Sequence, residues 1–247
     1  MFNDEKQHED FISTVSHELR TPLTSIRGFA QTMLASWDKL DDENKKKFIT
    51  IIEQQSNRLI NLVENMLSVN KLQSFKDKFV YKSADANSLI EPIVQIVKHQ
   101  YKNHTFEVEY NKKIPLIFVD VDKFQQIMTN LIENAAKYSN DGTKITIKTD
   151  FSCCPDYISI TVCDEGIGIK EEDFDKIFSN FSRLDNPLTR KVQGSGLGLY
   201  ITKTLTKKMG GEITLESSEN GTTFKVLLPV VDLENQIVKP FKGCDAK

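Results

Sequence analysis

Near the start of the chain, a histidine stands on the polar side of a helical pattern. On a helical wheel of residues 11–35, His17 lies roughly 160° from the apolar stripe, and Thr21 follows one turn later on the same side. An imidazole there is a candidate nucleophile, because Glu18 can accept a proton from one ring nitrogen and leave the other to attack. An isolated histidine is usually a plain surface residue, but Pro22 in the same pattern removes a backbone hydrogen bond, which is tolerated where geometry matters.

Amide and amine side chains recur along one side of a second helical pattern. Asn130, Asn134 and Lys137 are spaced by four and three residues, so they project from one face. Mg²⁺ and phosphate groups are bound by hard oxygen ligands and by cations, which an Asn carbonyl and a Lys amine supply. Seen alone, the pattern also fits a capped, solvated helix face.

Two glycine-rich runs follow. Asp164 begins the first, DEGIGI, directly after a predicted strand, and its carboxylate suits an exocyclic amine. The second, GSGLGL from Gly194 to Leu199, opens a helical pattern, where N–H groups and the positive helix end attract phosphates. The alternative for the first run is a plain turn, and the alternative for the second run is a flexible loop. No Gly-x-x-x-x-Gly-Lys-Ser/Thr run occurs, which excludes a Walker-type phosphate loop.

An aromatic pair and an arginine stand between the glycine-rich runs. Phe178 and Phe181 precede Arg183 in the pattern IFxxFxR. By itself this pattern is most often core aromatics beside a surface arginine.

Two long amphipathic helices are predicted for the first part of the chain, over residues 11–35 and 42–73, with Asp41 or Asp42 capping the second. The second carries a heptad seam with Gln55 as its one polar position. Further apolar positions lie outside that seam: Ile49, Ile60, Val63 and Leu67. A lone hairpin cannot bury both sets, so the sequence predicts a homodimer with a four-helix bundle.

The remaining pattern predicts an α/β sandwich. Helices are expected over 86–102, 121–138, 171–178 and 197–209, with strands over 105–110, 116–119, 144–149, 157–163, 212–217 and 223–228. The predicted organisation is a dimerisation hairpin at 8–73 that carries His17, a hinge linker with a short strand at 74–84, an α/β domain at 85–230 that carries the glycine-rich runs, and a tail at 231–247.

Composition excludes several classes of partner. The formal net charge of −3 and the pI of about 5.9 give no basic patch for nucleic acid. No apolar run reaches the roughly 18 residues that cross a bilayer, so no membrane contact is expected and the predicted location is cytoplasmic. The chain could still be the cytoplasmic part of a longer membrane sensor.

The run SHELRTPL from Ser16 to Leu23 resembles the H box of sensor histidine kinases. That resemblance implies that His17 is the phospho-acceptor and that Glu18 assists phosphotransfer. It also implies that Thr21 positions water for dephosphorylating a partner response regulator.

The four later patches, in order, resemble the N, G1, F and G2 boxes of the Bergerat-type ATPase domain, and the run from Gly221 to Phe224 resembles its last glycine turn. The resemblance implies ATP and Mg²⁺ as cofactors, with Asn134 as the metal ligand and Asp164 receiving the adenine amine. It implies a lid over ATP at 184–193. The residues expected around ATP are Asn130, Asn134, Lys137, Tyr138, Asp164, Gly166, Gly168, Ile169, Phe178, Arg183, Gly194, Ser195, Gly196, Leu197, Gly198, Leu199 and Thr223.

Two departures from that family pattern are visible. Ser179, Asn180 and Ser182 stand where the family often has charged or aromatic residues, and the lid is not especially rich in glycine. The expected function is ATP-dependent autophosphorylation on His17 followed by transfer to an aspartate of a response regulator. The alternatives are an ATP-binding dimeric scaffold without phosphotransfer, and a protein that acts mainly as a phosphatase on its regulator.

Overall fold

A computed structural model describes residues 2–73, 78–179 and 196–231. The chain divides into two compact units, residues 1–75 and residues 76–247, and each is described here by itself. Within the described ranges, no helix is both long and apolar enough to cross a membrane.

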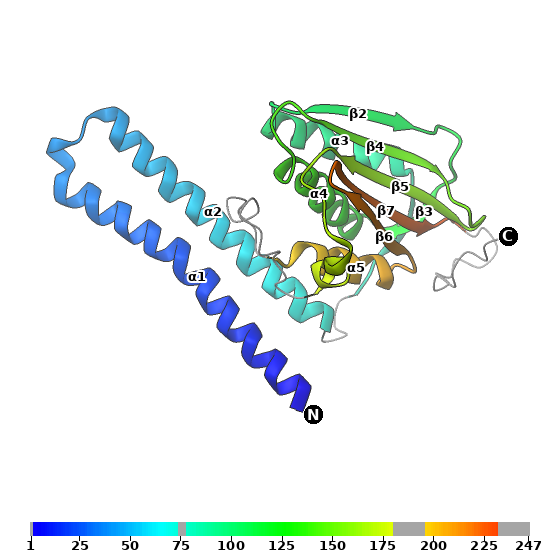
Figure 1. Ribbon diagram of the computed structural model, residues 1–247, viewed down its shortest axis with the longest axis horizontal. Helices are drawn as coiled ribbons and strands as arrows, with labels where there is room; N and C mark the ends of the chain where they lie inside the picture. The colour runs from blue at the N-terminus through cyan, green and yellow to red at the C-terminus, as the bar shows by residue number, and fades with distance from the viewer. Residues whose placement is uncertain (1, 74–77, 180–195, 232–247) are drawn as a thin grey trace. The chain divides into compact units, whose positions relative to one another are not determined.

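The first unit is a helical hairpin. Helix α1 (Phe2–Ser36) is joined through the 3₁₀ turn η1 (Trp37–Lys39) to helix α2 (Asp42–Gln73), which runs back alongside it (Figure 1). The carboxylate of Asp41 accepts the Asn44 N–H at 2.7 Å, and this bond lowers the pKa of Asp41. The predicted cap therefore lies at the start of α2, and the hairpin prediction is confirmed.

The hairpin buries one of its two apolar stripes. Leu62 and Val69 of α2 are 4% and 1% exposed, and the rings of Phe29 and Phe48 lie 5.2 Å apart between the helices. The second stripe on α2 is about half exposed; its members are Ile49, Ile60, Val63 and Leu67. A single hairpin therefore leaves apolar area in water that a partner could cover.

The second unit contains a five-stranded mixed sheet in the order β2-β4-β5-β7-β6. Its strands are β2 (Thr105–Tyr110), β4 (Lys144–Phe151), β5 (Tyr157–Asp164), β6 (Glu212–Ser218) and β7 (Gly221–Pro229). Strands β2 and β4 pair in parallel, and the other neighbours pair antiparallel. All five lie where the sequence predicts strands, because each is rich in β-branched and aromatic residues.

Three helices cover one face of this sheet, namely α3 (Ala86–Gln100), α4 (Val121–Lys137) and α5 (Gly198–Lys208) (Figure 1). Alternate strand residues point into that layer; Ile145, Ile147, Ile158 and Ile160 are all fully buried. On the other face, Lys144 and Lys148 of β4 form ion pairs with Glu107 and Glu109 of β2 at 3.2 and 2.7 Å. The unit is therefore the predicted α/β sandwich.

Part of the predicted linker belongs to the second unit. Strand β1 (Tyr81–Ala84) pairs antiparallel with β3 (Ile117–Asp120) in a separate two-stranded sheet. The Asp120 carboxylate caps α4 by accepting the Lys123 N–H at 3.1 Å, and it also accepts the Val80 N–H at 2.8 Å. The domain boundaries at 8, 74, 85 and 231 remain predictions.

One predicted helix is wrong. Residues 171–178 form two separate 3₁₀ turns, η2 (Glu171–Asp173) and η3 (Lys176–Phe178). Only Ile177 and Phe178 are buried there, so no apolar stripe extends over enough turns to stabilise a continuous α-helix. The predicted lid at 184–193 and most of the predicted tail lie outside the described residues.

Candidate functional site

His17 is exposed on α1, and Thr21 is exposed one turn later. The Thr21 hydroxyl donates to the backbone carbonyl of His17 at 3.2 Å. That bond uses the hydroxyl hydrogen of Thr21 and leaves the lone pairs of its oxygen available as acceptors. The structure therefore brings the predicted phospho-acceptor and the predicted water-positioning hydroxyl onto one solvent-facing patch.

Glu18 lies on the side of α1 that faces α2. Its Oε2 atom is 3.2 Å from Nη2 of Arg58, and the two side chains are only 16% and 22% exposed. The ion pair joins the two helices at the level of His17. Sequence reasoning missed Arg58, because the pair spans 40 positions and no local pattern signals it.

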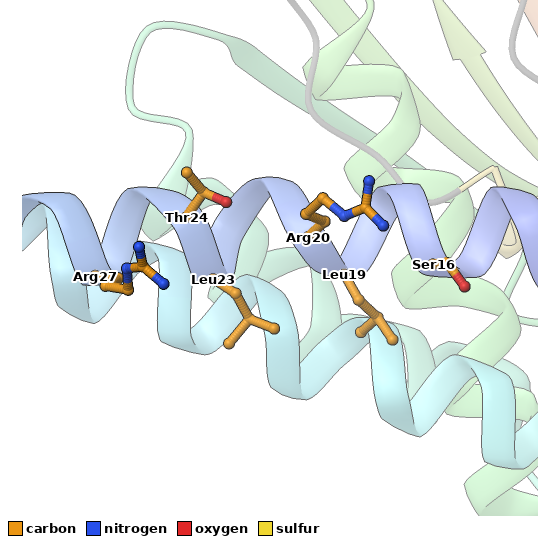
Figure 2. Close-up of a pocket in the computed structure, with 6 residues that line it drawn as sticks. All are labelled: Ser16, Leu19, Arg20, Leu23, Thr24 and Arg27. Carbon is orange, nitrogen blue, oxygen red and sulfur yellow. The ribbon is translucent and has the colours of Figure 1, made fainter.

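A shallow groove of about 430 Å³ runs beside the His17 patch (Figure 2). The residues that line it all belong to α1: Leu19 and Leu23 supply apolar surface, and Arg20 and Arg27 supply positive charge. Leu23 is 50% exposed although its side chain is apolar. The groove thus combines apolar surface with positive charge next to the histidine.

The amide and amine side chains of α4 lie on one partly buried face, as predicted. Asn130, Asn134 and Lys137 are all of intermediate exposure. The Lys137 amine is 2.6 Å from Oε2 of Glu133, one turn earlier on the same helix. Lys137 therefore carries its charge at the carboxyl end of α4, next to Tyr138.

Asp164 ends β5 with its carboxylate partly buried. Its Oδ1 atom accepts the N–H groups of Gly166 and Thr222, at 2.9 and 3.2 Å. Burial raises the pKa of Asp164 to about 6, and the two hydrogen bonds oppose that rise. Because both of these donors use Oδ1, Oδ2 keeps acceptor capacity for a ligand amine.

The turn after Asp164 is fastened to the end of α4. The Ile167 N–H donates to the carbonyl of Tyr138 at 3.2 Å, and Ser139 forms a β-bridge with Gly166. Gly168 has a φ of 67°, and any Cβ there would collide with the carbonyl of Ser218. Only glycine fits that position, so this motif glycine is required by the close backbone approach.

The start of α5 meets the same face of α4. Gly196 has a φ of 69°, Leu197 is fully buried, and a Cβ on Gly198 would collide with Oδ1 of Asn130. Leu199 is of intermediate exposure. The described parts of the N, G1 and G2 patches therefore converge on one place, formed by α4, the turn after β5 and the start of α5.

Phe178 is a packing residue in this structure. It is 9% exposed, its ring meets that of Phe224 edge-on at 6.3 Å, and the Lys203 amine lies 4.6 Å from its ring centroid. Its predicted contact with ATP remains a prediction.

The structure does not bring Thr223 to Asp164. Thr223 pairs with Cys163, so its side chain is on the helix-free face of the sheet. Thr222 pairs with Asp164 instead, and its hydroxyl lies 3.0 Å from that of Ser217, which accepts the Ile169 N–H at 2.8 Å. Thr222 is thus the threonine of this turn that lies on the same face of the sheet as Asp164.

Three predicted ATP contacts cannot be placed: Arg183, Gly194 and Ser195 lie outside the described residues.

Two families match the chain. Residues 7–75 match the His Kinase A (phospho-acceptor) domain, and residues 119–232 match the Histidine kinase-, DNA gyrase B-, and HSP90-like ATPase. The first match contains the exposed His17, and the second contains the cluster around Asp164.

Curated relatives agree with these matches. Sensor histidine kinase WalK of Bacillus subtilis is 33% identical over 91% of this chain, and sensor protein kinase WalK of Staphylococcus saprophyticus is 33% identical over 94% of it. The matched regions are 37% and 38% of those relatives, so the chain spans less than two fifths of their length.

Solved structures share the fold. The Acinetobacter baumannii histidine kinase AdeS gives a TM-score of 0.68 at 22% identity, covering 87% of this chain and 98% of that one. Histidine kinase ThkA, solved in complex with the response regulator protein TrrA, gives 0.67 at 25% identity, covering 95% of this chain and 67% of that one.

The helical hairpin with its exposed histidine, followed by the α/β sandwich, defines a phospho-acceptor domain joined to an ATPase domain. The chain belongs to the sensor histidine kinases.

Proposed function

We propose that this protein is an ATP-dependent histidine kinase that phosphorylates His17 and passes the phosphoryl group to an aspartate of a response regulator. The observation that carries the proposal is the occurrence, in one chain, of an exposed imidazole on α1 and of the three converging patches around α4. Because the substrate ATP is cytoplasmic, we propose a cytoplasmic site of action.

The described residues suit the adenine end of ATP. The Asp164 carboxylate already accepts the N–H groups of Gly166 and Thr222, so the amine of adenine is a matching donor for it. Nearby, the Ser139 hydroxyl is buried and finds no hydrogen-bond partner among the described residues. An unsatisfied buried hydroxyl beside Asp164 fits a polar ligand that arrives there. Tyr138 is proposed to lie against the adenine ring.

The phosphate end is proposed to lie between α4 and the start of α5. Asn130 and Lys137 would contact the phosphates, Arg183 would help neutralise their charge, and Asn134 would ligate Mg²⁺. Over the described ranges, no cluster of three His, Cys, Asp or Glu side chains could hold a metal. Phosphate oxygens and water would therefore supply the remaining ligands, which is the usual pattern for Mg²⁺. When bound, Mg²⁺ supplies charge neutralisation.

The chemical step at His17 is an in-line displacement. An imidazole nitrogen attacks the γ-phosphorus, the N–P bond forms as the bond to the leaving ADP oxygen breaks, and the phosphoryl group later moves to a carboxylate of the regulator. Glu18 is proposed to assist from the α2 side, where Arg58 fixes its position.

We also propose a homodimer and a regulator as partners. The exposed stripe on α2 supplies the dimer surface, and the groove beside His17 suits an amphipathic, partly acidic element of the regulator. The similarity to ThkA, which was crystallised with a response regulator protein, supports this partner class.

The test is labelling with γ-labelled ATP. The parent chain should acquire acid-labile, base-stable label, and His17→Gln should lose it while binding nucleotide normally. His99→Gln is the matched control, since His99 is also exposed on a helix, α3, but lies outside both patches. Nucleotide binding by the parent without any labelling would favour the dimeric scaffold and contradict the kinase.

A further inference from the structure

A side chain outside every motif holds one of the expected phosphate contacts. Nδ2 of Asn130 on α4 donates to the hydroxyl of Thr202 on α5 at 2.8 Å. Thr202 is 1% exposed and stands 72 positions further along the chain. The contact therefore joins two helices inside the sandwich.

The carboxamide of Asn130 touches two successive turns of α5. Its NH₂ group meets Thr202, and its Oδ1 atom lies against Gly198, four positions earlier on the same face. With both ends of the amide in contact, rotation about its terminal torsion would break the hydrogen bond or force Oδ1 away from Gly198. Thr202 thus fixes both the orientation of Asn130 and the approach of the first turn of α5 to α4.

That first turn is the part of α5 which the proposed function places at the phosphates. Its N-cap residue is Leu197, whose side chain has no polar atom to accept from the first N–H groups of the helix. Those N–H groups suit anionic phosphate oxygens only if α5 is held in register with Asn134 and Lys137 on α4.

Burial on α5 does not by itself give a threonine a partner. Thr206, one turn after Thr202, is fully buried, and its hydroxyl has no hydrogen-bond partner in the described part of the chain. The pairing of Thr202 is therefore specific to its contact with Asn130, and Thr206 offers a matched control.

We propose that Thr202 is a positioning residue whose hydroxyl, through Asn130, aligns the phosphate end of the nucleotide site. The inference rests on the proposed function, because it assumes that nucleotide phosphates bind at the start of α5. We expect Thr202 to have no effect on the adenine end of the site, which is built around Asp164.

The test compares two ligands with the full chain. ADP with Mg²⁺ probes the phosphate end, and adenosine, which lacks phosphates, probes the adenine end alone; both are followed by NMR titration. Thr202→Val keeps the shape but removes the hydroxyl, and should weaken ADP binding about tenfold, the value of one hydrogen bond, with adenosine affinity unchanged. Thr202→Ser should restore ADP affinity to within about twofold of the parent, and Thr206→Val should match the parent for both ligands.

Each other result has a meaning. Parent-like ADP binding by Thr202→Val, or an equal loss for adenosine, overturns the positioning role. So does an equal loss in Thr206→Val, or a failure of Thr202→Ser to restore affinity. If Thr202→Val does not fold, Thr202→Ala takes its place and is compared with Thr202→Ser. The ratio of ADP affinity to adenosine affinity should then be lower in Thr202→Ala. A parent that binds neither ligand contradicts the proposed function instead.

Discussion

Asp164 changes charge in an accessible pH range, because burial raises its pKa to about 6. An adenine amine donates to the ionised carboxylate, so protonation competes with binding. We expect adenosine affinity to be constant above pH about 7 and to fall about tenfold per unit below pH about 6. Titrations of the parent at pH values above and below this range measure the effect, with Asp164→Asn expected to bind more weakly and without this pH dependence.

Stability should move in the opposite direction. The pKa of Asp164 is higher in the folded than in the unfolded chain, so protonation of this group favours folding. That contribution is fully present below pH about 4 and is lost as pH rises through about 6. Weaker binding at low pH would therefore not reflect unfolding caused by Asp164. If the adenosine affinity of the parent does not change with pH, or if Asp164→Asn shows the same pH dependence as the parent, Asp164 does not recognise adenine.

Thr21 is placed for work on the phosphorylated regulator. Its hydroxyl donates a hydrogen bond to the His17 carbonyl, so its oxygen lone pairs are left to accept a hydrogen bond from an attacking water and to orient it. Thr21→Ala should retain autophosphorylation and lose about tenfold or more in regulator dephosphorylation. The measurement is a time course with purified phospho-regulator.

Thr32→Ala is the matched control for that experiment. Thr32 is also exposed on α1 and donates to the carbonyl four residues earlier, at 2.9 Å, but it lies four turns away from His17. If Thr21→Ala clears phosphate at the parent rate, or if Thr32→Ala is equally slow, the hydroxyl at Thr21 has no special role.

At the scale of elements, helix α2 presents a surface without a cover in one chain. Ile60 and Leu67 are each 53% exposed. Ile60→Glu with Leu67→Glu should convert a dimer into a monomer, because each charge would be buried at the interface. Sedimentation measures the mass, and Asn61→Glu, on an exposed position of the same helix, should leave it unchanged. A parent that is monomeric would disprove the predicted bundle.

Local patterns predicted most of the elements. The limits of α2 follow from Asp41 as its cap and from a heptad seam in which only Gln55 is polar, and they match the prediction. The helix predicted for residues 171–178 is wrong because this segment has too few apolar residues to define a helical period. The same residues are compatible with the two short 3₁₀ turns that form there. Elements with many periodic positions are therefore predictable, whereas short ones are decided by packing.

The candidate site was predicted less completely than the fold. Motif spacing predicted a site at Asp164 and the α4 face, and it selected Thr223, although Thr222 is the residue that pairs with Asp164. Strand register decides that choice, since side chains alternate between the two faces. Arg58 and Thr202 were missed because their partners are far away in sequence and only the fold brings them together.

At the scale of the molecule, the two units should melt separately. Trp37, the chain's one tryptophan, lies in the hairpin and is 50% exposed. Its fluorescence should report a transition that depends on protein concentration, as expected for a dimer, and not on nucleotide. ADP with Mg²⁺ at about 100 times its Kd should stabilise the other unit by about 2.7 kcal/mol, measured by calorimetry. An equal nucleotide shift in the Trp37 signal would show that the units unfold as one.

The order of the strands also governs how copies of the sandwich behave beside one another. Outer strands such as β2 can recruit a strand from a neighbouring molecule and start fibril growth. Here Glu107 and Glu109 place carboxylates along β2, and Glu216 is exposed on β6 at the opposite edge. Adding another strand would desolvate these charges and bring like charges together. The charged side chains on both outer strands therefore oppose edge-to-edge pairing between copies of the sandwich.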